Sequence, residues 1–180
     1  MAIRHDCFIV FDPADRASAE RFVERFRDVF IARVQGVRDE DGLEADGNTD
    51  PGALLHQIRR RYVWRAALTI VLTGSCTWAR RYVDWELAAA LRDDDEIGPR
   101  TGLLGIRLQG PQTSRPVIVP ERFADNVDTG YATFRPYPAS SEELRAWVEA
   151  ALVDRQYETP DNRRPLRLAD DPCPNERTHA

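Results

Sequence analysis

The stretch ALTIVLTGSCTWARRYVDWELAAAL, residues 67–91, contains the strongest structural signal of the chain. Its first part, 67–73, is apolar or β-branched and ends at a Gly-Ser pair, which is the pattern of a strand buried on both faces. Over 78–91 the pattern becomes helical. Residues at offsets of four, three and four share one face of this helix, namely Trp78, Tyr82, Trp85 and Ala89. The stretch therefore predicts a buried parallel strand followed by an amphipathic helix.

Glu86 lies beside this aromatic face, one helical turn beyond Tyr82 and next to Trp85. Its carboxylate is expected to lie against aromatic rings near the C-terminal end of a strand, where ligands bind in open α/β sheets. The other interpretation is an exposed glutamate paired with Arg80 or Arg81, since most glutamate side chains are exposed. The stretch alone leaves both interpretations open.

The length and composition fit one globular domain with an appendage. The chain has 180 residues, of which 42% are hydrophobic and 31% charged, and this is enough to bury a core. No run approaches the roughly 18–20 apolar residues that span a bilayer, and the first residues lack the apolar run of a signal peptide. We therefore expect a cytoplasmic protein that does not associate with membranes.

The charged residues and the cysteines exclude several functions. The net charge of −5 argues against a nucleic-acid-binding surface. All 25 basic residues are arginines, so mechanisms that need a lysine, such as a Walker P-loop or a Schiff base, are excluded. The three cysteines, Cys7, Cys76 and Cys173, are far apart and form no CxxC pair. We therefore expect neither a disulfide framework nor a metal site, and interpret Cys7 and Cys76 as core or turn residues.

The remaining pattern predicts further strands and helices in alternation. Strands are expected at 6–11, 34–37, 102–108 and 131–137, and helices at 18–33, 53–62 and about 140–154. The acidic segment 38–52, with three glycines, is expected to be a long loop. The segment with Pro111, Pro116 and Pro120 should contain no regular helix.

Five strands alternating with helices predict an α/β fold, a flavodoxin-like doubly wound sandwich around a central, mainly parallel five-stranded sheet. This domain is expected over residues 1–154. Residues 155–180 contain four prolines among many charges and little apolar content. They are expected to form an irregular or disordered tail, in which 165–168 is the stretch most suited to docking on the domain.

Two common families with this layout lack required residues here. A response-regulator receiver needs an aspartate at the end of the third strand and a lysine after the fifth, but the third strand ends in Thr73 and Gly74. A Rossmann domain needs a glycine-rich first turn to bind a pyrophosphate, but the first turn, residues 11–18, contains no glycine. Both families are excluded.

Two segments of the chain resemble the TIR domain family. In CFIVFDPADR, residues 7–16, Phe11 matches the family's aromatic residue and Asp15 its aspartate, while Val10 stands where many members have serine. In YVDWEL, Tyr82 takes the place of the usual tryptophan and Glu86 that of the glutamate.

The order of the expected elements, including the long loop after the second strand, also agrees with a TIR domain. The segments TIVLTGS and WARRYVDWEL are most similar to the TIR-like proteins of bacterial Thoeris antiphage defence. The resemblance covers about residues 5–153.

The resemblance implies an enzyme that acts on NAD, which is a substrate here and not a cofactor. In catalytic TIR domains the helix glutamate, here Glu86, is required to cleave the bond between nicotinamide and ribose. In Thoeris-like members the product is an ADP-ribose-derived signal that activates an effector protein. We expect a cyclic product, although the sequence leaves linear and conjugated forms open. The resemblance also implies self-association and a phage-derived trigger.

The other candidate site residues lie in or near the two matching segments. We expect the following to bind substrate: Phe11, Asp12, Asp15, Ser75, Arg81, Tyr82 and Trp85. Phe11 would offer a flat face to nicotinamide or adenine, and Arg16 and Arg80 are further candidates for the diphosphate. Structural interpretations stay open for Phe11 as a core residue, for Asp12, Asp15 and Ser75 as cap or turn residues, and for the three arginines as surface residues.

Two other functions stay open at this stage. One is a non-catalytic TIR module that acts by self-association or by binding another TIR domain. The other is a nucleoside hydrolase or transferase of similar layout, which would also place a glutamate at a ribose. The glutamate at position 86 favours the NAD-cleaving enzyme, whereas Val10 and Tyr82 depart from the commoner residues of the family.

Overall fold

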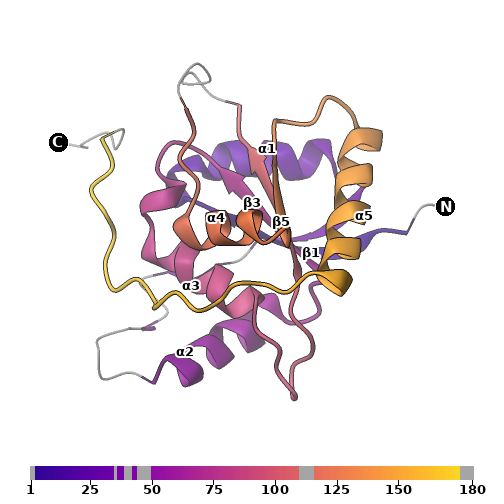
Figure 1. Cartoon of the computed structure of the whole chain (residues 1–180). Helices are drawn as coiled ribbons and strands as arrows, with labels where there is room; N and C mark the ends of the chain where they lie inside the picture. The colour runs from indigo at the N-terminus through magenta and orange to yellow at the C-terminus, as the bar shows by residue number, and fades with distance from the viewer. Residues whose placement is uncertain (1–2, 35, 39–41, 44–49, 110–115, 175–180) are drawn as a thin grey trace.

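The central strand of the sheet, β3 (Leu68–Thr73), is buried along its whole length, in agreement with its unbroken apolar run. The computed structural model describes all residues except 1–2, 35, 39–41, 44–49, 110–115 and 175–180. Most of the acidic loop predicted at 38–52 thus lies outside the described residues. β3 pairs in parallel with β1 (His5–Phe11) and β4 (Gly102–Arg107), and the edges are β2 (Phe30–Arg33) and β5 (Ala132–Arg135) (Figure 1).

Helices cover both faces of this sheet (Figure 1). They are α1 (Arg16–Arg25), α2 (Pro51–Ile58), α3 (Arg81–Ala90), α4 (Glu121–Asp128) and α5 (Ser141–Tyr157). Val10 and Val71 pack with α2, α3 and α4 on one face, whereas Ile9 and Ile70 pack with α1 and α5 on the other. This alternation confirms the doubly wound α/β fold, with a sheet that is parallel throughout. None of the helices in the described ranges is both long and apolar enough to cross a membrane.

The strand order β2-β1-β3-β4-β5 creates a switch point between β1 and β3. The connection from β1 leads to one side of the sheet and the connection from β3 to the other, so a crevice forms at the carboxyl ends of these strands. Two short 3₁₀ helices, η1 (Pro13–Asp15) and η4 (Thr77–Ala79), follow the two strands at this point. The residues predicted to bind substrate in these two turns are therefore brought to the same edge.

The structure corrects the predicted helix at 18–33 and the strand at 34–37. α1 ends at Arg25, and β2 already occupies Phe30–Arg33, where Phe30 pairs with His5. Phe26, Val29 and Phe30 have helical spacing, but all three are buried in the cluster beneath α1 and α5 as parts of a turn and a strand. Pairing with β1 therefore overrides the local helical pattern.

The region between β4 and β5 also differs from the prediction. The described part of the proline-containing segment, 116–120, has no helix, as predicted, but α4 begins directly after it at Glu121. A proline just before a helix is compatible with helix formation because the first N–H groups have no partner within the helix. Phe123 of α4 is fully buried against the sheet, and this contact fixes the position of α4.

Arg59 holds the C-terminal end of α3. It lies in η3 (Arg59–Val63), a π-helical turn after α2, and its side chain is 2% exposed. The guanidinium donates hydrogen bonds to the carbonyls of Ala89 and Ala90, at 3.0 and 3.5 Å, and to those of Gly98 and Pro99. It thus satisfies helix-end carbonyls that have no partner within α3.

Replacing Arg59 by lysine is expected to lower the free energy of unfolding by about 2 kcal/mol, because one ammonium group cannot serve the same four carbonyls. Urea unfolding followed by circular dichroism measures this loss. The neighbouring exposed Arg60 provides the control, since Arg60→Lys should change the stability by less than about 0.5 kcal/mol. An equal loss in both variants would contradict the role of Arg59.

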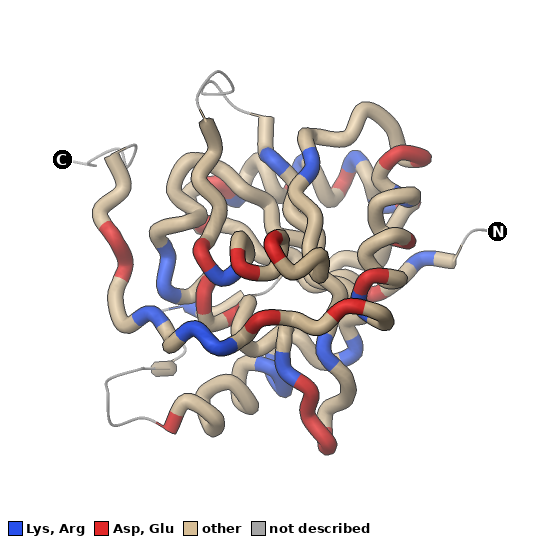
Figure 2. The backbone as a smooth tube through the Cα atoms, in the orientation of Figure 1, with Lys and Arg blue, Asp and Glu red and all other residues tan. Residues whose placement is uncertain are grey.

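The chain after α5 has no helix or strand over 158–174, yet it packs along α4 and α3 (Figure 1). Arg122 of α4, 1% exposed, donates to Asn162 Oδ1 at 2.8 Å and to the Pro165 carbonyl at 3.1 Å. Leu166 packs against the main core. Figure 2 shows the basic residues of this segment passing beside the acidic residues of α4, where Arg164 pairs with Asp125 at 2.8 Å.

A disulfide joins Cys76, in the turn after β3, to Cys173 near the end of the described chain, with 5.7 Å between the Cα atoms. The expectation that the cysteines form no disulfide framework is therefore wrong for this pair. Cys76 and Cys173 are 97 residues apart, and only the path of the tail along α3 brings them together. Cys7 is a buried free cysteine in the core, as predicted.

Candidate functional site

Glu86 lies in the middle of α3 and is almost completely buried, with 4% of its surface exposed. Its Oε1 accepts a hydrogen bond from the backbone N–H of Val37 at 2.7 Å. The backbone at Gly36 also lies directly over this carboxyl group, because a Cβ atom at Gly36 would collide with Oε1 of Glu86. The segment that follows β2 therefore covers Glu86 in this conformation. The exposed, arginine-paired glutamate considered above is ruled out.

Two aromatic side chains flank Glu86 on α3. The rings of Tyr82 and Trp85 meet edge to face with 5.1 Å between their centroids. Trp85 is 1% exposed and its Nε1 donates to the Arg167 carbonyl at 2.7 Å, while Tyr82 is half-buried. The Arg81 guanidinium lies 4.7 Å from the centroid of the Tyr82 ring and donates to its hydroxyl at 2.9 Å. The two rings thus pack on each other on α3, and Trp85 is directed towards the tail. Their contact with the Glu86 carboxyl group stays a prediction.

Burial changes the acidity of Glu86. Removal from water raises the pKa of its carboxyl group to about 8, and the hydrogen bond from Val37 N–H, which favours the charged form, only partly opposes this shift. In the closed conformation, Glu86 is therefore mostly protonated at neutral pH. Exposure to water would return the pKa towards its ordinary value of 4.5 and restore the carboxylate.

A second group of candidate residues lies at the switch point between β1 and β3. Asp12 is buried and caps η1, with Oδ1 accepting from Ala14 N at 3.0 Å and Oδ2 accepting from Arg80 Nε at 2.9 Å. Asp15 lies over Gly74, where any side chain would collide with its carboxyl group. Burial and the nearby charge of Asp12 raise the pKa of Asp15 to about 6, although Arg80 lowers it.

Phe11 and Ser75 are the remaining candidates at this edge. Phe11 is half-buried at the end of β1, and the guanidinium of Arg16 lies 5.7 Å from the centroid of its ring. Ser75 is exposed, and its carbonyl accepts from Trp78 Nε1 at 3.2 Å. Trp78 lies in η4, before α3 begins. The prediction that it shares the aromatic face of that helix is therefore wrong.

The candidate residues therefore form two groups. Asp12, Asp15 and Ser75 lie on the turns after β1 and β3, whereas Glu86 lies on the second turn of α3, where its hydrogen bond goes to Val37. Arg80 joins the first group through Asp12.

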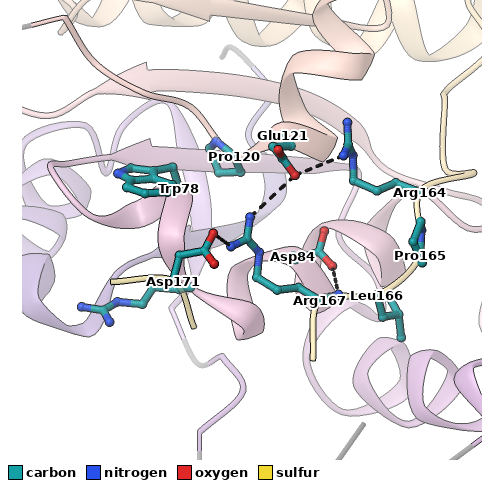
Figure 3. Close-up of a pocket in the computed structure, with 10 residues that line it drawn as sticks. Trp78, Asp84, Pro120, Glu121, Arg164, Pro165, Leu166, Arg167 and Asp171 are labelled. Carbon is teal, nitrogen blue, oxygen red and sulfur yellow. Dashed lines mark hydrogen bonds and ion pairs between the residues drawn. The ribbon is translucent and has the colours of Figure 1, made fainter. Parts of the chain in front are cut away.

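A cavity of about 340 Å³ lies between α3, α4 and the tail (Figure 3). Asp84 lines it, and Asp84 points away from Glu86 because two residues correspond to about 200° around a helix. The charged residues that line the cavity pair with one another across it, as in the contacts of Glu121 with Arg164 and Arg167. The cavity is therefore separate from the covered Glu86.

Some residues that shape the candidate site have no recognisable signal in the sequence. Gly36 and Val37 cover Glu86 from a segment 49 residues away, and neither belongs to a motif. Arg80 has a stronger structural role than an exposed arginine, since its side chain is 14% exposed and holds Asp12.

Comparison with known proteins supports the assignment that the fold and the position of Glu86 suggest. No curated protein matches the sequence. A family model described as the TIR-like domain of Thoeris protein ThsB matches residues 8–113, which is more than half of the chain and extends from β1 through β4. Glu86 and its aromatic neighbours lie within the matched range. The chain therefore belongs to the family of TIR-like domains of Thoeris protein ThsB.

Proposed function

We propose that this protein cleaves NAD between nicotinamide and ribose and produces an ADP-ribose-derived signal in antiphage defence. The observation that carries the proposal is the carboxyl group of Glu86, buried on α3 beside Tyr82 and Trp85 in a Thoeris TIR-like domain. NAD is the substrate, and the residues at the switch point, Asp12, Asp15, Ser75 and Phe11, together with Arg81, bind it. The signal acts on an effector protein.

The chemistry fits a carboxylate in a dry environment. The bond between C1′ of the ribose and the nicotinamide nitrogen breaks, and its electron pair leaves with nicotinamide as a neutral pyridine. The ribose then carries an oxocarbenium-like positive charge, which a carboxylate stabilises as in glycoside hydrolysis. Addition of water yields ADP-ribose and a proton, whereas attack by a nucleophile of the same molecule yields a cyclic product. Once NAD is bound, Tyr82 and Trp85 exclude water and so strengthen the interaction of Glu86 with this charge.

The covered state of Glu86 imposes a condition on this reaction. The backbone at Gly36 and Val37 occupies the position from which substrate would approach Glu86, so it moves before NAD binds. The same movement admits water and lowers the pKa of Glu86, which converts the carboxylic acid to the catalytic carboxylate. Opening and activation of the glutamate are thus one event.

Replacing Gly36 by alanine is expected to displace this cover, because the new Cβ collides with Oε1 of Glu86. The value of kcat/KM for NAD cleavage in the wild type should rise with pH to a midpoint near 8, since it reports the free enzyme. In Gly36→Ala, the midpoint should move down by about one pH unit or more. Gly52→Ala is the matched control, since a Cβ there meets its neighbours at ordinary distances of 3.4 Å or more. Identical pH profiles in all three proteins would contradict the proposal that the backbone at Gly36 and Val37 covers Glu86 and raises its pKa.

Incubation with a panel of substrates tests the reaction itself. The concentrated protein is mixed separately with NAD and with purine and pyrimidine nucleosides, and products are separated by chromatography and identified by mass spectrometry. We expect nicotinamide and an ADP-ribose derivative from NAD and no free base from nucleosides. Release of free base from nucleosides, with NAD unchanged, would favour the nucleoside hydrolase.

A second candidate function is an interaction module that acts by self-association. The observation that favours it is the closed state of Glu86, because a sealed carboxylic acid can serve as a structural group that fixes the segment after β2. In that case Glu86→Gln would leave self-association unchanged and no preparation would consume NAD. Sedimentation velocity of both proteins, beside the NAD assay, separates the two functions.

A further inference from the structure

The tail consists of two parts that are held in different ways. The near part, 161–167, is held by buried groups of the domain. Asn126 donates to the Asp161 carbonyl at 2.8 Å, and Arg122 binds Asn162 and Pro165. At the end of the near part, the Arg167 backbone N–H donates to Asp84 at 2.9 Å, and the Arg167 carbonyl accepts from Trp85 Nε1. These partners, Asn126, Arg122, Asp84 and Trp85, are all buried.

The far part, 168–174, has mainly polar contacts at the surface. Every residue in it except Cys173 is exposed, and the Leu168 side chain is 60% exposed. Asp170 accepts from Arg81 N at 2.8 Å, and the Asp171 N–H donates to the Ala79 carbonyl at 2.9 Å. The disulfide from Cys173 to Cys76 is the covalent attachment of this part to the domain.

The far part completes the N-terminal end of α3. The N-cap residue of this helix is Arg80, whose side chain makes no capping hydrogen bond. Asp170 supplies the missing acceptor to the N–H of Arg81 and also lies 3.5 Å from the Arg80 guanidinium. The cap of the helix that carries Glu86 thus comes from a residue 89 positions away, three residues before the disulfide.

We propose that the Cys76–Cys173 disulfide is a redox-operated lock, which holds residues 168–174 on the start of α3 and releases them when it is reduced. A thiolate of a dithiol attacks one sulfur and forms a mixed disulfide, with the other cysteine leaving as a thiolate. The second thiol of the reductant then displaces the remaining cysteine. The protein gains two electrons and two protons, and the dithiol becomes a cyclic disulfide.

The different anchoring of the two parts determines what reduction does. Without the disulfide, the far part retains two backbone-linked hydrogen bonds, partly exposed ion pairs and the small apolar contact of Cys173 with Ala79 and Trp78. These do not offset the entropy cost of ordering seven residues. The near part keeps its bonds to buried side chains and stays docked. Reduction therefore removes the cap from α3, which exposes the N–H of Arg81 and the side chain of Arg80, the partner of Asp12 at the switch point.

Hydrogen exchange measured by mass spectrometry tests the lock on the full chain, with and without dithiothreitol. After reduction, the amides of Arg81 and Asp171 should exchange at least tenfold faster, whereas those of Asp161 and Arg167 and the strand β3 should be unchanged. The double variant Cys76→Ser/Cys173→Ser should behave like the reduced protein under both conditions. Alkylation under native conditions should label no cysteine before reduction and two afterwards, since Cys7 is buried and burial raises the pKa of its thiol.

The variant Asp170→Ala distinguishes the effect of the disulfide from that of the hydrogen bond that Asp170 accepts from Arg81 N. In the oxidised variant, the Arg81 amide should exchange faster while the Asp171 amide stays protected, because the disulfide still holds the far part. The proposal is overturned if reduction labels both cysteines but leaves the exchange of Asp171 unchanged. It is also overturned if reduction accelerates exchange throughout β3, since the disulfide would then be a requirement of the whole fold.

Discussion

At about pH 9, Glu86→Gln is expected to be more stable than the wild type by about 5 kcal/mol, and below about pH 4.5 this difference disappears. The reason is the cost of keeping Glu86 buried. Its pKa is about 8 in the folded protein and near 4.5 when the chain unfolds. Between these values the folded state binds more protons than the unfolded state, so the stability of the wild type falls as the pH rises through this window. Glutamine has no charge to lose and still offers an oxygen to Val37 N–H.

Urea unfolding of both proteins across this pH range gives the difference directly. Glu96→Gln is the matched control because the Glu96 side chain is 82% exposed, and its effect should not change by more than about 0.5 kcal/mol with pH. A stability difference for Glu86→Gln that is the same at all pH values would show that Glu86 is not held as a buried acid. The expected result would mean that the protein retains a destabilising residue at the position proposed for catalysis.

Replacing Arg122 by methionine is expected to lower the free energy of unfolding by about 3–5 kcal/mol. Arg122 is 1% exposed and forms two hydrogen bonds to Asp84, at 2.8 and 3.2 Å, besides its bonds to Asn162 and Pro165. Methionine fills similar space but leaves the buried Asp84 carboxylate without its cation. The variant should also release the near part of the tail, which would accelerate hydrogen exchange at Asp161 and Arg167.

Arg164→Met serves as the comparison for this variant. Arg164 also pairs with acidic residues of α4, but it is exposed, and exposed ion pairs contribute at most about 1 kcal/mol. Combining Arg122→Met with Asp84→Asn should recover part of the loss, because the second change removes the unpaired charge. A loss below about 1 kcal/mol for Arg122→Met alone would contradict the role of the pair in joining α3, α4 and the tail.

The sequence predicts those parts of the fold in which local pattern and tertiary packing agree. The unbroken apolar run of β3 can bury the side chains on both of its faces only in the interior of a sheet, and β3 is the central strand. The N-terminal end of α5 is equally clear, since Ser140 accepts from Glu143 N. The Glu143 side chain accepts from Ala139 N, one residue before the N-cap residue that a capping box would use. Leu54, Leu55 and Ile58 of the helix predicted at 53–62 pack in the core.

The errors arise where a distant partner decides the structure. Phe26, Val29 and Phe30 have helical spacing, but pairing of Phe30 with His5 makes β2 a strand. Neither the contact between Cys76 and Cys173 nor the pair of Asp84 with Arg122 leaves a local pattern. The sequence therefore indicates 165–168 as suited to docking but not the path of the tail along α4 and α3. The same holds for the site, where sequence places Glu86 beside aromatic rings but cannot show that Val37 covers it.

The most direct test of the central claim is nicotinamide release from NAD by the wild type, Glu86→Gln and Glu96→Gln at about pH 8. Each protein is assayed at high concentration, with and without lysate from phage-infected cells, after circular dichroism has shown that it is folded. Release by the wild type and by Glu96→Gln, with a loss of about 10²-fold or more in Glu86→Gln, is the predicted result. Equal release by Glu86→Gln, or no release by any of the folded proteins with or without lysate, would contradict catalysis by Glu86.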